Sequence, residues 1–235
     1  MADKMKQFLA DYYHKELYKL FQFLIPRNKK VLEIGCGEGE LLASVSSQGI
    51  GIDVSPNMIK AAKKKHPNIK FVEGDAHNLN FQEKFDYVIM ADLIGYLFDI
   101  QRAFENLHKV STYKTRIIIS YYNYLWEPIL LLAQKLGLMK SQKTQNWLAM
   151  KDIENLLFLA NLEVIKKGNM FLMPIKIPLI SEIFNKFLAK LPLIKHLGLI
   201  QYLVVRQMPN TYSDKDYSVS VIIPARNEAG NIEQA

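Results

Sequence analysis

Two hydrophobic periodicities alternate along this chain. Short apolar runs, typical of buried strands, lie between segments in which apolar residues recur every three or four positions, as in helices. The predicted strands cover residues 31–34, 49–53, 69–73, 85–90, 115–121, 162–168 and 201–207, and the predicted helices cover residues 39–47, 56–65, 100–109, 127–138 and 151–160. This alternation predicts an α/β fold with a doubly wound, mostly parallel sheet of seven strands.

Two further segments have helical periodicity. Residues 6–25 place aromatic and leucine side chains at spacings of three and four, which predicts an amphipathic helix before the first strand. Residues 170–191 are apolar with interspersed lysines, which predicts a helical insertion between the last two strands. Core packing is the simplest role for this insertion. The alternatives are that it covers the acceptor pocket or that it contacts an anionic membrane surface.

A glycine-rich loop follows the first predicted strand. Gly35, Gly37 and Gly39 alternate directly after Ile34, and glycines at this place let the backbone approach a nucleotide-like ligand. Asp53 ends the next strand, where a carboxylate can accept hydrogen bonds from both hydroxyls of a ribose. These residues predict one half of a nucleoside-binding site.

Spacing and charge indicate which ligand the loop holds. A dinucleotide fingerprint needs a third glycine five positions after Gly35, but that position is Glu40. Glu38 and Glu40 would also repel a pyrophosphate. Glu33 and this acidic rim favour a positively charged ligand such as S-adenosylmethionine, which has a ribose and an adenine but no phosphate. A nicotinamide-dependent dehydrogenase is the weaker alternative.

The segment Glu33–Gly39, together with Asp53, resembles the first two motifs of the class I S-adenosylmethionine-dependent methyltransferases. The resemblance covers about residues 30–120 and implies a Rossmann-like fold with an antiparallel last strand. It also implies the cofactor S-adenosylmethionine, with Asp75 at the adenine amino group and Ala91 and Asp92 beside the methyl donor. Cys36 in the loop is interpreted as a small filler. The predicted cofactor-binding residues are Glu33, Gly35, Cys36, Gly37, Gly39, Asp53, Val54, Met58, Asp75, Ala76, Ala91 and Asp92.

Acceptor and catalytic residues are expected at the same edge of the sheet, because ligands of such sheets bind where the parallel strands end. Methyl transfer requires a nucleophile held about 3 to 3.5 Å from the methyl carbon, and a hydroxyl nucleophile also requires a base. The candidates for this base are Asp92, His14 and Tyr121. The predicted acceptor-binding residues are Tyr12, Tyr13, Tyr96, Tyr122, Asn123 and Trp126. Core packing is the alternative role for these aromatic residues, and no metal site is predicted.

The C-terminal segment carries a second resemblance. Residues 217–228 resemble the opening strand and loop of family 2 glycosyltransferases. The predicted organisation is therefore a methyltransferase domain over residues 1–208, a linker over 209–217 and the truncated start of a glycosyltransferase domain over 218–235. This layout resembles the N-terminal half of bacterial proteins that fuse the two domains, and it implies a glycan, glycolipid or isoprenoid-linked acceptor.

Composition bears on the compartment and the partners of this protein. The 235 residues carry a net charge of +7 and one cysteine, and the chain shows no apolar leader and no stretch long enough to span a bilayer. We therefore expect a cytoplasmic protein, with peripheral contact at the inner face of the membrane left open. Nucleic acid is an unfavoured substrate, because residues 91–94 lack the Asn/Asp-Pro-Pro-Tyr motif of amino methyltransferases.

These observations predict an enzyme that methylates a small-molecule, glycan or lipid-linked acceptor. The alternative is a non-catalytic cofactor-binding module that docks or regulates a fused glycosyltransferase.

Overall fold

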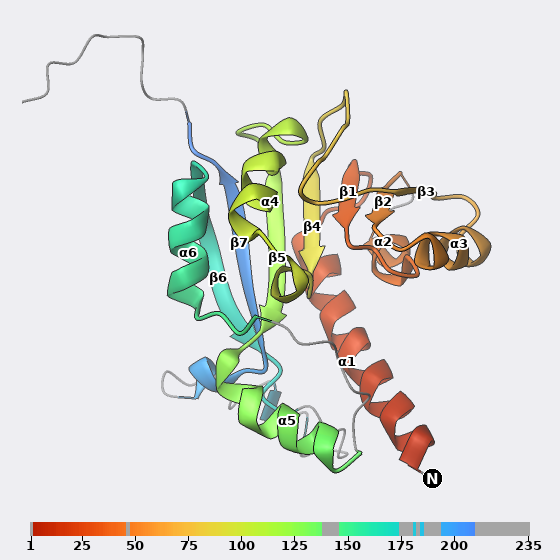
Figure 1. Ribbon diagram of the computed structural model, residues 1–235, viewed down its shortest axis with the longest axis vertical. Helices are drawn as coiled ribbons and strands as arrows, with labels where there is room; N and C mark the ends of the chain where they lie inside the picture. The colour runs from red at the N-terminus through yellow and green to blue at the C-terminus, as the bar shows by residue number, and fades with distance from the viewer. Residues whose placement is uncertain are drawn as a thin grey trace, which may run out of the picture.

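The computed structural model describes residues 2–45, 48–137, 146–173, 181, 184–185 and 194–209. A seven-stranded sheet with the order β3-β2-β1-β4-β5-β7-β6 forms its centre (Figure 1). The strands are β1 (Val31–Ile34), β2 (Ile50–Asp53), β3 (Lys70–Glu73), β4 (Tyr87–Ala91), β5 (Arg116–Tyr122), β6 (Leu162–Met170) and β7 (Ile200–Gln207). Strands β1 to β5 pair in parallel, and β7 is antiparallel to both β5 and β6. The predicted fold class is confirmed.

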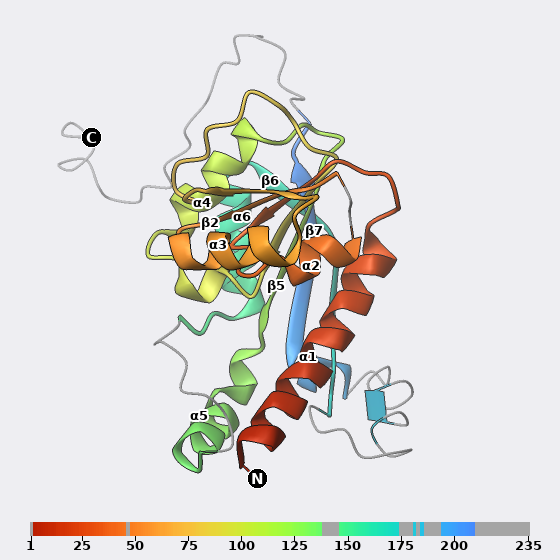
Figure 2. The same cartoon turned by 90° about the vertical axis from the view of Figure 1, so that its right-hand side faces the viewer.

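Helices cover both faces of this sheet. The helices are α1 (Ala2–Leu24), α2 (Glu40–Val45), α3 (Pro56–Lys65), α4 (Ile100–Asn106), α5 (Glu127–Lys135) and α6 (Met150–Leu159), and the short 3-10 turns are η1 (Ile94–Tyr96), η2 (Leu107–Lys109), η3 (Tyr124–Trp126) and η5 (Lys195–Leu197). Helices α4 and α6 pack on one face and α1, α2 and α3 on the other. Helix α5 lies beyond the ends of the strands (Figures 1 and 2).

Successive residues of the buried strands alternate between two hydrophobic cores. In β1, Leu32 and Ile34 join the core beneath α4 and α6, whereas Val31 joins the core beneath α1, to which Leu17 and Phe21 contribute. This alternation follows from the two-residue repeat of a strand. Since both faces are buried, the strands read as continuous apolar runs in the sequence.

Local signals start the helices near the functional edge of the sheet. Ser55 caps α3 in an extended conformation, its hydroxyl accepts the N–H of Met58, and Pro56 occupies the first turn. Asp99 caps α4 by accepting the N–H of Arg102 at 2.9 Å. The carboxyl ends of the parallel strands β1 to β4 meet at one edge. Short loops lead from β1 into α2, from β2 into α3 and from β4 into η1.

Part of the predicted organisation falls outside the described residues. The predicted insertion is described only at residues 170–173, 181 and 184–185, and the predicted glycosyltransferase start at 218–235 and all but residue 209 of the linker lie outside the described ranges. Within the described ranges, none of the helices has the length and apolar character needed to cross a membrane.

Candidate active site

The glycine loop after β1 has a backbone conformation that favours glycine. Gly35, Gly37 and Gly39 have φ values of +76°, +52° and +83°, which disfavour side chains. A Cβ at Gly35 would lie 2.8 Å from Leu93, and one at Gly39 would lie 2.5 Å from the Phe71 ring. A Cβ at Gly37 would meet nothing within 4 Å. Gly35 and Gly39 thus allow close packing against Leu93 and Phe71, whereas Gly37 leaves open space above the loop.

Glu33 lies beneath this loop. Its side chain is 3% exposed, and its Oε2 accepts the N–H of Leu42 at 3.0 Å. Burial raises the pKa of the Glu33 carboxyl to about 8, and the nearby charge of Asp53 acts in the same direction. In this position Glu33 ties the loop to α2, and its predicted direct contact with a cofactor stays a prediction.

The expectation of a free acidic rim on the loop is wrong. The carboxylates of Glu38 and Glu40 both contact Lys65 Nζ at the end of α3, and His66 lies 3.5 Å from Glu40. The ammonium of Lys65 lowers the pKa of the Glu38 carboxyl. The single ammonium of Lys65, more than twenty residues further along the chain, offsets one of these two negative charges. The rim is therefore paired with α3 but keeps part of its negative charge.

Asp53 stands at the end of β2 and binds the loop directly. Its Oδ2 accepts the N–H of Gly37 and its Oδ1 accepts the N–H of Ser55, both at 2.9 Å. Each carboxylate oxygen has a second acceptor site for a ligand hydroxyl. Beside it, Val54 and Met58 are 70% and 42% exposed. Uncovered apolar side chains next to a half-buried carboxylate suit a ligand with an apolar face and hydroxyl groups.

Asp75, after β3, is held by a partner that the sequence analysis did not single out. Asp75 Oδ1 accepts the backbone N–H of His77 at 2.9 Å and lies 2.6 Å from His77 Nδ1. The backbone bond from His77 lowers the pKa of the Asp75 carboxyl. Both of these contacts fall on Oδ1, so among the described residues Oδ2 is left as an acceptor that a ligand donor could use. The neighbouring Ala76 is buried, and Phe98 stacks on the His77 ring with centroids 3.9 Å apart.

Asp92 is the centre of a buried hydrogen-bond cluster. Its Oδ2 accepts the hydroxyl of Tyr13 at 2.5 Å, and its Oδ1 accepts the hydroxyl of Ser120 at 3.3 Å. Burial raises the pKa of the Asp92 carboxyl, and the bonds from Tyr13 and Ser120 oppose that shift. Asp92 also has a φ of +52°, a strained conformation of the kind that clusters at functional sites. Ser120 is placed here because it pairs with Ala91 in the β4–β5 ladder.

A small cavity of about 10 Å³, room for about one water molecule, adjoins Asp92. It is lined by Asp92, Ile94, Gly95, Tyr121, Tyr122, Asn146, Trp147 and Leu148. The Tyr121 hydroxyl is buried and, among the described residues, makes no hydrogen bond. Burial raises the pKa of Tyr121, which keeps this hydroxyl protonated.

The predicted acceptor role of Asn123 is corrected by the structure. Asn123 is fully buried. Its amide donates to the carbonyls of His196 and Gly198, both at 2.9 Å, and its Oδ1 accepts the N–H of Leu125 at 3.2 Å. Because no Asn123 atom is left for a ligand, this residue is a structural clamp between the end of β5 and the segment before β7.

The other aromatic candidates lie around the acceptor side. Tyr13 stacks on Tyr122 with centroids 5.5 Å apart, and burial raises the pKa of Tyr13 well above its usual value. Tyr12 packs against Phe171 at 5.2 Å. Tyr96 is 43% exposed. Partial burial raises the pKa of its hydroxyl, and the charge of Asp92 acts in the same direction.

Two further candidates differ in character. His14 is exposed on α1, with its ring 5.3 Å from that of Tyr13, so it lies beside the Asp92 cluster rather than in it. Trp126 donates its indole N–H to the carbonyl of Leu197 at 2.7 Å. Cys36 is buried, and burial raises the pKa of its thiol to about 12, which suits a packing role rather than a nucleophile.

Comparison with known proteins identifies the family. A family model described as a methyltransferase domain matches residues 25–175, more than half of the chain. The chain belongs to the methyltransferase domain family. A demethylmenaquinone methyltransferase of Chlorobaculum tepidum is 33% identical over 89 residues, which make up 36% of this chain and 37% of that protein. A malonyl-acyl-carrier-protein O-methyltransferase of Ilyobacter polytropus is 31% identical over 98 residues, or 38% of this chain and 37% of that protein. The matches thus span less than two fifths of these relatives.

Solved structures share the fold of this methyltransferase domain. An S-adenosylmethionine-dependent methyltransferase of Thermotoga maritima superposes with a TM-score of 0.65 at 17% identity, over 85% of this chain and 91% of that one. The predicted enzyme class, a methyltransferase, and the predicted cofactor, S-adenosylmethionine, are confirmed at the level of the family and its fold.

The residues present fit S-adenosylmethionine. The space above Gly37 is open to a Cβ and hence to a ligand, and Asp53 and the open Oδ2 of Asp75 offer acceptors for ribose hydroxyls and an adenine amino group. Val54 and Met58 expose apolar surface beside Asp53. Glycine loop, carboxylates and apolar flank therefore lie together at the edge where β1, β2 and β3 end.

Proposed function

We propose that this domain transfers the methyl group of S-adenosylmethionine to a small-molecule, glycan or lipid-linked acceptor whose nucleophile lies against Asp92. The observation that carries the proposal is the Tyr13–Asp92–Ser120 cluster, which stands at the end of β4, next to β1 and its glycine loop. A buried carboxylate on a strained backbone adds little to the stability of the fold, whereas with two hydrogen-bond donors to orient it, it can act as a base.

The binding half of the site consists of three elements. Gly37 supplies open backbone, Asp53 accepts the ribose hydroxyls, and Asp75 accepts the adenine amino group. When bound, S-adenosylmethionine supplies a methyl group activated by its sulfonium. The chain's own contribution is orientation, since an in-line displacement depends mainly on how its two reactants are held.

Asp92 takes the proton of a hydroxyl or amine acceptor at one of its carboxylate oxygens. Tyr13 and Ser120 keep the carboxylate charged and oriented by donating to its two oxygens. Burial acts in the opposite direction and raises the pKa of Asp92, which makes it a stronger base than an exposed carboxylate. The Tyr121 hydroxyl in the adjoining cavity positions the acceptor by donating to one of its polar atoms.

The glycan or lipid-linked class of acceptor is supported by the C-terminal sequence. Residues 217–228 resemble the start of a family 2 glycosyltransferase, and a fused methyltransferase would act on the substrates or products of that domain. The same resemblance supports a covalent fusion to a glycosyltransferase domain, and the single cysteine supports a cytoplasmic protein. Nucleic acid remains an unfavoured acceptor, because the segment after β4 lacks the motif of amino methyltransferases.

A transfer assay with labelled S-adenosylmethionine tests the proposal. Lipid-linked glycan and small-molecule fractions from cells that lack the protein serve as acceptors. Asn tolerates the left-handed backbone of Asp92 and can still accept the Tyr13 bond, so Asp92→Asn should lower turnover by about 10²- to 10⁴-fold and leave cofactor affinity nearly unchanged. Asp86→Asn, at the opposite end of β4, is the matched control and should retain activity. Cofactor binding without label transfer to any fraction would instead support a non-catalytic module that docks or regulates a glycosyltransferase.

A further inference from the structure

Helix α5 and the turn before it expose a stripe of aliphatic side chains. Leu125, Ile129, Leu132 and Leu136 follow one another at spacings of four, three and four residues, and they are 44%, 55%, 57% and 64% exposed. This spacing places side chains on one face of a helix. In α5 itself Leu130 is the buried residue, so among the described residues the stripe faces away from the core.

Amphipathic aromatic residues and a further leucine border the stripe. Tyr124 is 44% exposed, and the Trp126 indole donates to the carbonyl of Leu197, a residue that is itself 47% exposed. Tyr and Trp with one apolar and one polar side are the residues that settle at membrane–water interfaces. We call the surface of Tyr124, Leu125, Ile129, Leu132, Leu136 and Leu197 the α5 face.

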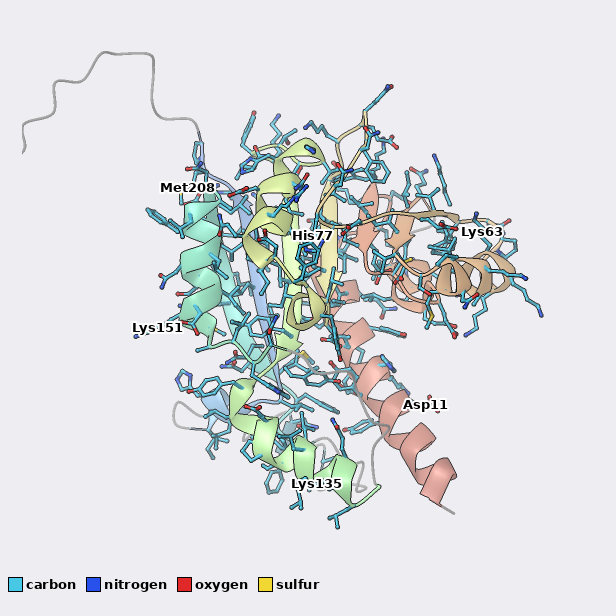
Figure 3. The ribbon with its side chains drawn as sticks, in the orientation of Figure 1. Asp11, Lys63, His77, Lys135, Lys151 and Met208 are labelled. Carbon is cyan, nitrogen blue, oxygen red and sulfur yellow. The ribbon has the colours of Figure 1, made fainter. Side chains whose placement is uncertain are left out.

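The charge beside the α5 face is positive. Lys135 is exposed at the end of α5, as Figure 3 shows. In the sequence, residues 125–150 carry lysines at positions 135, 140 and 143 and one acidic residue, Glu127. Of these lysines, Lys135 belongs to the described residues.

 The chain as a whole carries a net charge of +7. An apolar helix face that ends in an exposed lysine, on a positively charged protein, is typical of helices that lie in the interface of an anionic bilayer.

The position of the α5 face also relates it to the acceptor side of the site. In both views α5 lies beyond the carboxyl ends of the strands, near the first turns of α1 (Figures 1 and 2). The chain enters this face directly from Tyr122, which lines the cavity beside Asp92. A partner that binds the α5 face would therefore lie next to the acceptor cavity.

We propose that the α5 face docks on an anionic phospholipid bilayer, with α5 lying in the plane of the interface. An anionic bilayer satisfies the aliphatic stripe, the bordering aromatic residues and the exposed Lys135 together, whereas a purely apolar protein surface would leave Lys135 without a counter-charge. This docking goes beyond the proposed methyl transfer, because it requires neither cofactor nor turnover.

Vesicle co-sedimentation of the full chain tests the proposal. Wild-type protein should bind vesicles of phosphatidylcholine with phosphatidylglycerol, bind pure phosphatidylcholine more weakly, and release with added salt. The double variant Ile129→Gln/Leu132→Gln keeps charge and helix propensity and should bind about tenfold more weakly. The matched control Phe158→Gln/Leu159→Gln changes two residues of α6 that are each 66% exposed and should bind like wild type.

Three results would overturn the docking proposal. They are the absence of vesicle binding by wild type, equal binding by the two double variants, and a dimer in sedimentation velocity that Ile129→Gln/Leu132→Gln dissociates while vesicles have no effect. Far-UV circular dichroism and binding of S-adenosylhomocysteine check that each variant is folded. Methylation of a water-soluble acceptor is measured in parallel, so that a failure of docking is distinguished from a failure of the proposed activity.

Discussion

Replacement of Glu33 by glutamine should remove a large part of the pH dependence of this domain's stability. Glu33 is 3% exposed, and its Oε2 accepts the N–H of Leu42. Glutamine has the same shape, and its carbonyl oxygen can accept the same N–H. The substitution therefore removes the ionisation of this side chain and little else.

The sign of the effect follows from the direction of the pKa shift. Burial raises the pKa of Glu33 from 4.5 to about 8, so the folded state binds this proton more tightly than the unfolded chain does. The resulting stabilisation is complete below about pH 4.5 and is lost as the pH rises to about 8. At about 1.36 kcal/mol per pH unit, this interval corresponds to at most about 5 kcal/mol.

Urea unfolding at several pH values between about 5 and 8.5 measures this effect. The free energy of unfolding of the wild type should fall by several kcal/mol more than that of Glu33→Gln over this range. The difference between the two proteins isolates Glu33 from other titrating groups. Parallel pH profiles for the two proteins would refute the assignment of a buried, protonated Glu33. A large loss of cofactor affinity in Glu33→Gln would favour the direct contact predicted from the sequence.

Two further substitutions separate catalytic from structural roles. Tyr13→Phe should cost about 1.5 to 3 kcal/mol of stability. In the wild type the bond from Tyr13 lowers the pKa of Asp92, so its removal should shift the acid limb of the pH–rate profile to higher pH. An acid limb at the same pH in the rate assay would contradict this role. Asn123→Ala should cost about 2 to 4 kcal/mol in thermal or urea unfolding, because the carbonyls of His196 and Gly198 lose their donor and the one of Gly198 is buried. Undiminished stability would show that Asn123 is no clamp.

Periodicity predicted the sheet well because buried parallel strands leave a local signature. The predicted strand at 31–34 and helix at 56–65 coincide with β1 and α3. The exact ends of the strands were less predictable. Residues 85 and 86 were expected to be part of a strand, but the N–H of Phe85 donates to the carbonyl of Val110 in a turn, and β4 begins at Tyr87.

The candidate site was predictable where a short motif carries it and unpredictable where distant residues meet. The glycine loop and Asp53 are local to two consecutive strands. The partners of Asp92 are not, since Tyr13 lies 79 residues earlier and Ser120 lies 28 residues later. The pairing of Lys65 with the loop carboxylates depends on the packing of α3, which no spacing in the sequence encodes.

Calorimetric titration of the purified chain with S-adenosylmethionine is the most direct test of a cofactor site above the glycine loop. Asp53→Ala should weaken binding by about 1 to 3 kcal/mol, or about 5- to 150-fold, whereas Asp86→Ala, at the other end of the sheet, should bind like wild type. No heat of binding with wild-type protein, or equal affinity in Asp53→Ala and wild type, would contradict the account.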